Sequence, residues 1–157
     1  MARKQRVSLP NVPVHILKKS INQQEIFHDK KDCESFYFFM RDIAKNLDIN
    51  IFAYIILKES FEFVISSIYE ENISKFMQIL GRQYVLYYNK KYSRTGTIWD
   101  GRYKSSLVEK ELFLPKVISY IEYLSIENNL IDTICTSVKD KKKIDLEKNE
   151  IEFIENA

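Results

Sequence analysis

Strand-like and helix-like segments alternate along this chain in an order that leaves few possible folds. Short β-branched runs predict strands, and longer runs with apolar residues three or four positions apart predict amphipathic helices. The segments follow one another as strand, helix, two strands joined by a tight connection, helix, returning strand and a last helix. We expect these elements at residues 12–19, 33–47, 50–58, 61–68, 72–92, 102–109 and 111–131.

The order β-α-β-β-α-β is that of the ferredoxin-like split sheet, so we expect an α+β fold with an additional C-terminal helix. Asp32 and Asn72 stand at the start of two helical patterns and are the expected N-caps. Many unrelated functions occur on this architecture, which therefore does not decide what the chain does. Apolar residues of these patterns are expected to form the core, namely Phe39, Ile43, Phe52, Tyr54, Phe63, Ile65, Phe76, Leu80 and Ile121.

The size and composition predict one packed domain. With 157 residues, of which 45% are hydrophobic, the chain is large enough to bury a core without metals or disulfides. We expect this domain at residues 1–134, followed by a charged appendage at residues 135–157. Cys33 and Cys135 have neither metal-ligand nor redox spacing, and two thiols favour a reducing cytoplasm. No signal peptide or apolar run near the roughly 18 residues of a membrane helix is present, so no membrane partner is expected.

Positive charge is concentrated in two segments, although the formal net charge is only +2. Residues 1–20 contain five lysines and arginines and no acid, and residues 79–110 contain seven against two acids. Such segments indicate an anionic partner, for example nucleic acid. Ordinary solvated lysines explain the charge equally well, so both interpretations stay open on charge alone.

One segment of the second basic region has a distinctive sequence. RTGTIWDGRYKSSLV, residues 94–108, resembles the RTGTLWEGRYKSSL signature of the REP-associated tyrosine transposases. These proteins belong to the single-tyrosine, His-hydrophobic-His transposases of bacterial insertion sequences. The resemblance covers about residues 1–131 and implies a bacterial, cytoplasmic protein that acts in DNA transposition. Four other segments match family motifs in the same order, at residues 1–16, 21–32, 76–97 and 119–131.

The chain departs from the family where the family binds its catalytic metal. There, a segment like AYVLMPNHVHLLL carries two histidines that bind Mg²⁺ or Mn²⁺. Here the matching segment AYIILKESFEFVI, residues 53–65, has Ser60 and Glu62 in the two histidine slots. Glu62 offers one oxygen ligand, but a serine hydroxyl is a poor ligand at neutral pH. We therefore expect no metal cofactor, and alternation with the neighbouring phenylalanines predicts that Glu62 faces solvent.

The family nucleophile is a tyrosine, and the resemblance places Tyr120 in its slot. In the family this side chain attacks phosphorus and forms a covalent 5′-phosphotyrosine. Tyr120 also fits the apolar face of its helix, so we interpret it as a structural residue that keeps the position of the nucleophile. His15 matches a family histidine on the first strand, but one histidine makes no site. His28 is expected in a loop.

The basic region keeps the cationic character of the family. Cations interleaved with aromatic rings suit phosphate contacts and base stacking, and Gly96 and Gly101 allow the backbone to come close to a phosphate. For Trp99 the alternative is a core position in an ordinary hairpin. The expected nucleic-acid contacts are Arg82, Lys90, Lys91, Arg94, Trp99, Arg102 and Lys104.

The sequence thus predicts a transposase-like protein that binds hairpin or single-stranded DNA, or RNA, without cleaving it, in a regulatory or structural role. A first alternative is an active single-tyrosine transposase with an altered metal site that uses Glu62, His15 or Glu122. A second alternative is a protein-interaction module whose partner docks on the C-terminal segment or on the aromatic first helix. Monomer and homodimer both remain open.

Overall fold

The computed structural model describes residues 8–131 and 133–139 of the chain. Within these residues the elements follow the predicted order, with a short 3-10 turn added after the first strand. No helix in this part of the chain is both long enough and apolar enough to cross a membrane. The elements are β1 (Val14–Lys19), η1 (Ile21–Gln23), α1 (Lys30–Asn46), β2 (Ile49–Ile56), β3 (Ser60–Ser67), α2 (Glu70–Lys91), β4 (Lys104–Leu107) and α3 (Phe113–Glu127).

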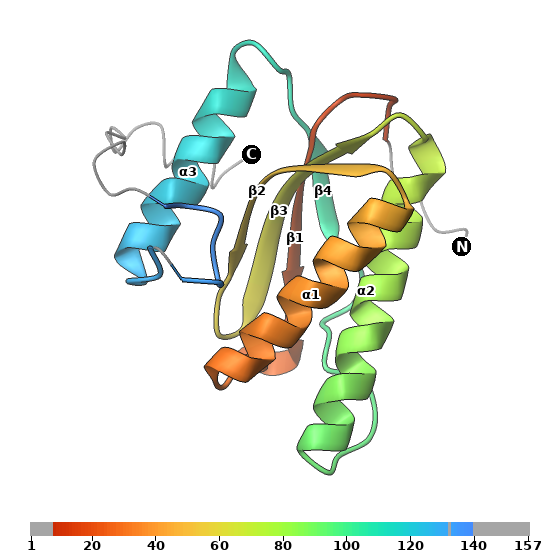
Figure 1. Cartoon of the computed structure of the whole chain (residues 1–157), viewed down its shortest axis with the longest axis vertical. Helices are drawn as coiled ribbons and strands as arrows, with labels where there is room; N and C mark the ends of the chain where they lie inside the picture. Colours follow the sequence, from red (N-terminus) through yellow and green to blue (C-terminus); the bar gives the residue numbers. More distant parts are fainter. Residues whose placement is uncertain (1–7, 132, 140–157) are drawn as a thin grey trace.

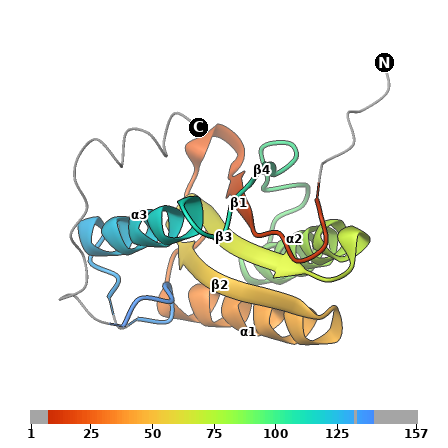
Figure 2. The same cartoon turned by 90° about the horizontal axis from the view of Figure 1, so that it is seen from above.

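The four strands form one antiparallel sheet in the order β2-β3-β1-β4. Figure 1 shows α1 and α2 side by side over one face of this sheet, and Figure 2 shows α3 on the opposite face, near β2. This is the predicted ferredoxin-like α+β arrangement with its additional C-terminal helix. The sheet therefore has two differently covered faces, one under α1 and α2 and one under α3.

Aromatic side chains fill the main core between the sheet and the pair α1 and α2. Phe36, Phe61 and Phe63 are at most 1% exposed. Their rings lie close together, with centroids 4.9 Å apart for Phe36 and Phe61 and 4.7 Å apart for Phe61 and Phe63. Burial of several such rings is the largest source of stability in a domain of this size. Seven of the predicted core residues are buried, namely Ile43, Tyr54, Phe63, Ile65, Phe76, Leu80 and Ile121.

Two predicted core residues are placed differently. Phe52 is 38% exposed, because a β-bulge between Ile51 and Ala53 interrupts the alternation of β2. The strand pattern assumed strict alternation and so put Phe52 on the wrong side. Phe39 is only partly buried and packs at the margin of the main core.

Both predicted N-caps are wrong. Asp29 caps α1, and its Oδ1 accepts a hydrogen bond of 2.9 Å from the backbone N–H of Asp32. α2 begins after Tyr69, so Asn72 lies inside its first turn and donates from Nδ2 to the carbonyl of Leu47 at 2.8 Å. Asx and Ser side chains near a helix start compete for the cap position, and the sequence pattern does not decide between candidates three residues apart.

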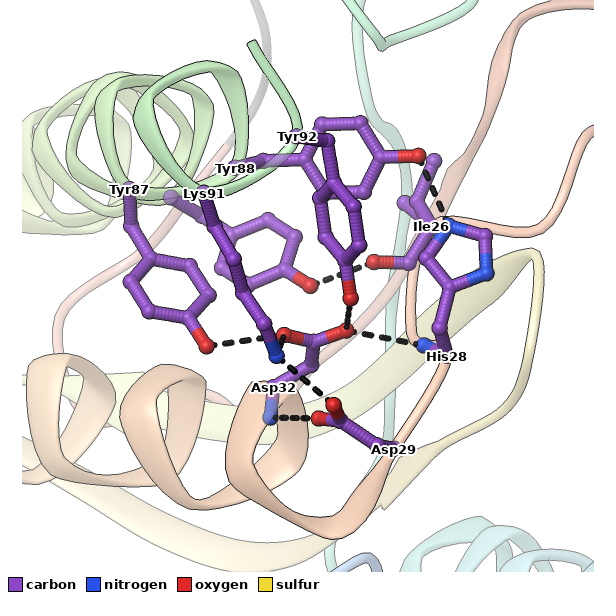
Figure 3. Close-up of polar contacts among 9 residues, drawn as sticks. Ile26, His28, Asp29, Asp32, Tyr87, Tyr88, Lys91 and Tyr92 are labelled. Atoms are coloured by element: carbon purple, nitrogen blue, oxygen red, sulfur yellow. Dashed lines mark hydrogen bonds and ion pairs between the residues drawn. The ribbon is translucent and has the colours of Figure 1, made fainter.

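The carboxylate of Asp32 is fully buried and ties α1 to the end of α2 (Figure 3). Burial on its own raises the pKa of Asp32, but hydrogen bonds from Lys91 and three further donors outweigh burial and lower the pKa to about 2. Burial also raises the pKa of Tyr92 to about 12, so its hydroxyl stays protonated and donates. The four donors are Lys91 Nζ at 2.8 Å, Tyr92 Oη at 2.6 Å, Tyr87 Oη at 2.7 Å and the His28 amide at 2.9 Å.

Acid should therefore destabilise the fold through Asp32. Its folded pKa of about 2 lies below the roughly 3.9 of an unfolded aspartate, so its stabilising contribution is complete above about pH 5 and is lost as the pH falls towards 2. Between pH 6 and pH 2.5 we expect this group to cost about 2 kcal/mol of unfolding free energy. Urea unfolding of the parent and of Asp32→Asn at both pH values measures this loss of unfolding free energy. Equal losses in the two proteins would contradict the assignment.

The predicted boundary after residue 134 falls inside a segment that packs on the sheet. The amide of Ile56 donates to the carbonyl of Cys135 at 2.7 Å, and the amide of Ser137 donates to the carbonyl of Tyr54 at 3.1 Å. Thr136 is fully buried. Residues 135–138 therefore belong to the packed domain, because they cover the edge of β2. The predicted appendage beyond residue 139 lies outside the described residues.

Candidate functional site

α3 holds Tyr120 against the sheet. Val117, Ile121 and Leu124 pack with small and β-branched residues of β2 and β3, and Tyr120 on the same side of the helix is 8% exposed. The Tyr120 ring meets the ring of His15 on β1 edge to face, with centroids 6.2 Å apart and planes at 81°. Tyr120, which the resemblance places in the nucleophile slot, thus lies next to His15, for which no site was expected.

Glu62 is buried, and the prediction that it faces solvent is wrong. Its residue is 5% exposed, and its Oε1 lies 2.9 Å from His15 Nε2. The main core takes Phe61 and Phe63, so alternation does turn Glu62 to the other face of β3. That face is covered by α3, and the pairing of β1 with β3 sets His15 diagonally across from Glu62, since His15 pairs with Val64.

His15, Glu62 and Tyr120 therefore form one polar cluster under the edge of α3. The imidazole and the carboxylate satisfy each other, and either a neutral or a protonated His15 can donate to Glu62. Sequence reasoning missed this pair because it depends on the register between β1 and β3. Alternation within each strand was the one available signal. It shows which face of the sheet a side chain lies on, but it does not show which residue of the neighbouring strand lies beside it.

The side chains at these positions do not fit the metal site that the family resemblance implies. Ser60 and Glu62 occupy the two slots, and the Glu62 carboxylate is already hydrogen-bonded to His15. Among the described residues, no group of three or more histidine, cysteine or acidic side chains is arranged to hold a metal ion. Glu122 lines a small cavity with Phe52 at the edge of β2.

Among the described residues, α3 covers mainly the β2 and β3 part of the sheet face that carries this cluster and reaches β1 only at His15. α3 packs on β2 and β3, whereas β1 and β4 pair with Leu17 opposite Lys104 and His15 opposite Ser106. Residues paired in this way point to the same side of a sheet, as do residues two apart in one strand. Lys104 and Ser106 are exposed there, and so is Lys19. We call this surface the open face, which consists of His15, Leu17, Lys19, Lys104 and Ser106.

Two of the predicted nucleic-acid contacts are held by internal hydrogen bonds. Lys91 Nζ donates to Asp29 at 2.7 Å as well as to Asp32. Arg94 donates from one Nη to Asn89 Oδ1 at 2.8 Å and from the other to a backbone carbonyl, and it lies over the ring of Tyr88. These charges stabilise the end of α2 and the loop after it.

Trp99 belongs to the core, so the predicted role in base stacking is wrong. It is 7% exposed, its Nε1 donates to the carbonyl of Gly81 on α2 at 3.2 Å, and its ring meets Phe61 edge to face. The glycines of the same loop have left-handed backbone angles, φ 88° at Gly96 and 65° at Gly101, which only glycine adopts without strain. The distinctive loop is therefore built around a core tryptophan and two turns.

The remaining predicted contacts are exposed but come from two layers of the fold. Arg82 and Lys90 lie on α2, which covers the face opposite α3, whereas Lys104 lies on the open face. Arg102 is exposed in the loop just before β4. Lys19 was not predicted as a nucleic-acid contact. Its spacing from His15 along β1 nevertheless places both side chains on the same face of the sheet.

Comparison with known proteins identifies the family and agrees with the fold. Residues 8–123 match the family model described as "Transposase IS200 like". The fold is similar to a REP-associated tyrosine transposase bound to a REP hairpin, with a TM-score of 0.66, 10% identity, and coverage of 85% of this chain and 78% of that one. It is also similar to a protein from Deinococcus radiodurans R1 named as a transposase, with a TM-score of 0.53, 15% identity, and coverage of 78% and 97%. The comparison with curated proteins found no significant match. The chain belongs to the IS200-like transposase family.

Proposed function

We propose that this chain binds hairpin or single-stranded DNA across the open face, beside Tyr120, and does not cleave it. The observation that carries the proposal is the presence of the exposed cations Lys19 and Lys104 on the face that also bears the nucleophile slot. Phosphate oxygens bind to such cations with little dependence on sequence. The similar transposase that was solved with a REP hairpin supports a hairpin as the form of the ligand.

Absence of cleavage is proposed from the chemistry of the site residues. Attack by a tyrosine on phosphorus needs stabilisation of the charge that develops on the phosphate oxygens, which a divalent metal or strong donors supply. Ser60 and the hydrogen-bonded Glu62 supply neither. A protein of this kind serves a regulatory or structural role, with the hairpin as its ligand.

Hairpin binding should depend steeply on salt. With about three to four phosphate contacts, the plot of log affinity against log salt should have a slope of roughly −2 to −3, at about 0.7 per contact for single strands. Lys104→Ala should reduce the slope by about 0.7. Fluorescence anisotropy with a labelled DNA hairpin measures both. Lys75→Ala is the matched control, because Lys75 is exposed on α2 in the other layer, and an equal effect of both changes would argue against the open face.

Strand cleavage by Tyr120 is the second candidate, and one observation favours it. His15 and Glu62 meet next to Tyr120, so an imidazole and a carboxylate already lie beside the family nucleophile. We nevertheless expect no covalent protein–DNA adduct when the chain is incubated with a single-stranded hairpin and Mg²⁺ or Mn²⁺. Denaturing gels with labelled DNA test this. An adduct that disappears in Tyr120→Phe would establish the active transposase in place of the binder.

A further inference from the structure

The fold brings together the two cysteines of the chain. Cys33 lies in the first turns of α1, and Cys135 lies in the segment that covers the edge of β2. Both line a cavity of about 940 Å³ that also reaches the turn between β2 and β3. Cys33 is 7% exposed, whereas Cys135 is only partly buried. Their separation in the sequence gave no sign of this contact.

The surroundings fix Cys135 beside Cys33. The carbonyl of Cys135 accepts a hydrogen bond from Ile56, and its amide donates to Thr133 Oγ1 at 3.2 Å. The Cys135 side chain packs against the main core at the cluster that contains Cys33. A hydrogen bond joins the two thiols, which are free of any disulfide. Two thiols that line one cavity and interact with each other are placed to react.

The two thiols differ in acidity. The hydrogen bond from Cys33 lowers the pKa of Cys135 although burial opposes it, and the hydroxyl of Thr133 adds to the lowering. The same contact and burial raise the pKa of Cys33. The thiolate is the reactive form of cysteine. Cys135 is therefore the group suited to attack a reagent in the cavity, and Cys33 is suited to a second, internal step.

We propose that Cys135 and Cys33 form a redox-active dithiol site that reacts with low-molecular-weight disulfides such as glutathione disulfide. The Cys135 thiolate attacks one sulfur of the reagent, which forms a mixed disulfide and releases one glutathione thiolate. Cys33 then loses its proton and attacks the Cys135 sulfur, which closes the internal disulfide and releases the second glutathione. Two protein thiols are oxidised, and one reagent disulfide is reduced to two thiols.

Closure would link two parts of the fold covalently and a third through a hydrogen bond. The Cys33 end belongs to α1, and the Cys135 end belongs to the segment that pairs with β2. The next residue of that segment, Thr136, shares a hydrogen bond of 2.6 Å with the Ser125 hydroxyl of α3. In the oxidised chain, the segment that contacts α3 is therefore joined covalently to α1, which lies on the opposite face of the sheet. This proposal does not depend on nucleic-acid binding, because neither cysteine lies on the open face.

Mass spectrometry of the full chain in glutathione buffers tests the site. The parent should end with one internal disulfide and no bound glutathione. Cys33→Ser should stop with one glutathione on Cys135, because the second step is removed. Cys135→Ser should stay unmodified, because Cys33 is buried and its thiolate is disfavoured. A lasting glutathione adduct on the parent, a disulfide-linked dimer, or equal modification of the two variants would overturn the proposal.

A measurement on the unaltered chain covers the case in which a variant fails to fold. Under reducing conditions, brief treatment with iodoacetamide should modify Cys135 at least about tenfold faster than Cys33, as expected for the more exposed and more acidic thiol. Peptide mapping assigns the modified residue. Equal rates, or faster modification of Cys33, would contradict the proposed order of the two steps.

Discussion

Replacing Asp32 by alanine should lower the free energy of unfolding by about 3–5 kcal/mol, the range found when one partner of a buried ion pair is removed. The substitution leaves the hydroxyls of Tyr87 and Tyr92 without their acceptor and removes one of the two carboxylates that bind the ammonium of Lys91. It also removes the acceptor of the His28 amide, which fixes the chain just before α1. The loss is large because four donors converge on one carboxylate that has no contact with water.

Two controls separate the charge from the packing. Asp32→Asn keeps the size and one acceptor oxygen, so it should cost less than alanine. Lys91→Met removes the cation but keeps the apolar stem, and the three other donors of Asp32 remain. Chemical unfolding monitored by fluorescence compares the variants. A loss below about 1 kcal/mol for Asp32→Ala would mean that the carboxylate does not tie α1 to α2, since changes of that size are typical of surface positions.

The order of elements could be predicted from the sequence because it depends on local periodicity. β3 and α2 show this well, since alternating phenylalanines mark the strand and apolar residues at helical spacing mark the helix. Phe52 shows the limit of the same rule. A bulge adds one residue to β2 and reverses the side to which its neighbours point, and the residues themselves contain no clear sign of it.

The candidate site was harder to predict because its members meet through long-range pairing. Tyr120 was placed by resemblance, but Glu62 and His15 come together only once β1 is paired with β3 in one register. Cys33 and Cys135 likewise meet across separate elements. Trp99 was misread for a different reason. A tryptophan in a basic turn fits both base stacking and core packing, and the carbonyl of Gly81 that decides the matter lies on another helix.

Reversing the charge of both open-face cations should have the largest effect on DNA binding. In Lys19→Glu with Lys104→Glu, each change removes a phosphate contact and adds repulsion. Because each change should cost about tenfold or more in affinity, we expect a total loss of roughly 100-fold or more at low salt. Both side chains are exposed, so stability should change little. Anisotropy with the labelled hairpin measures the affinity, and circular dichroism confirms the fold.

The matched control reverses Lys45 and Lys75 instead, which are exposed on α1 and α2 in the layer away from the open face. Its net charge equals that of the open-face variant, so long-range repulsion is the same in both. We expect the control to lose only a few-fold in affinity, since distant charges are screened over about 10 Å at 0.1 M salt. Equal losses would mean that binding follows overall charge without a defined surface. If neither variant loses affinity, the open face does not bind nucleic acid, and a protein-interaction module becomes the better account of this chain.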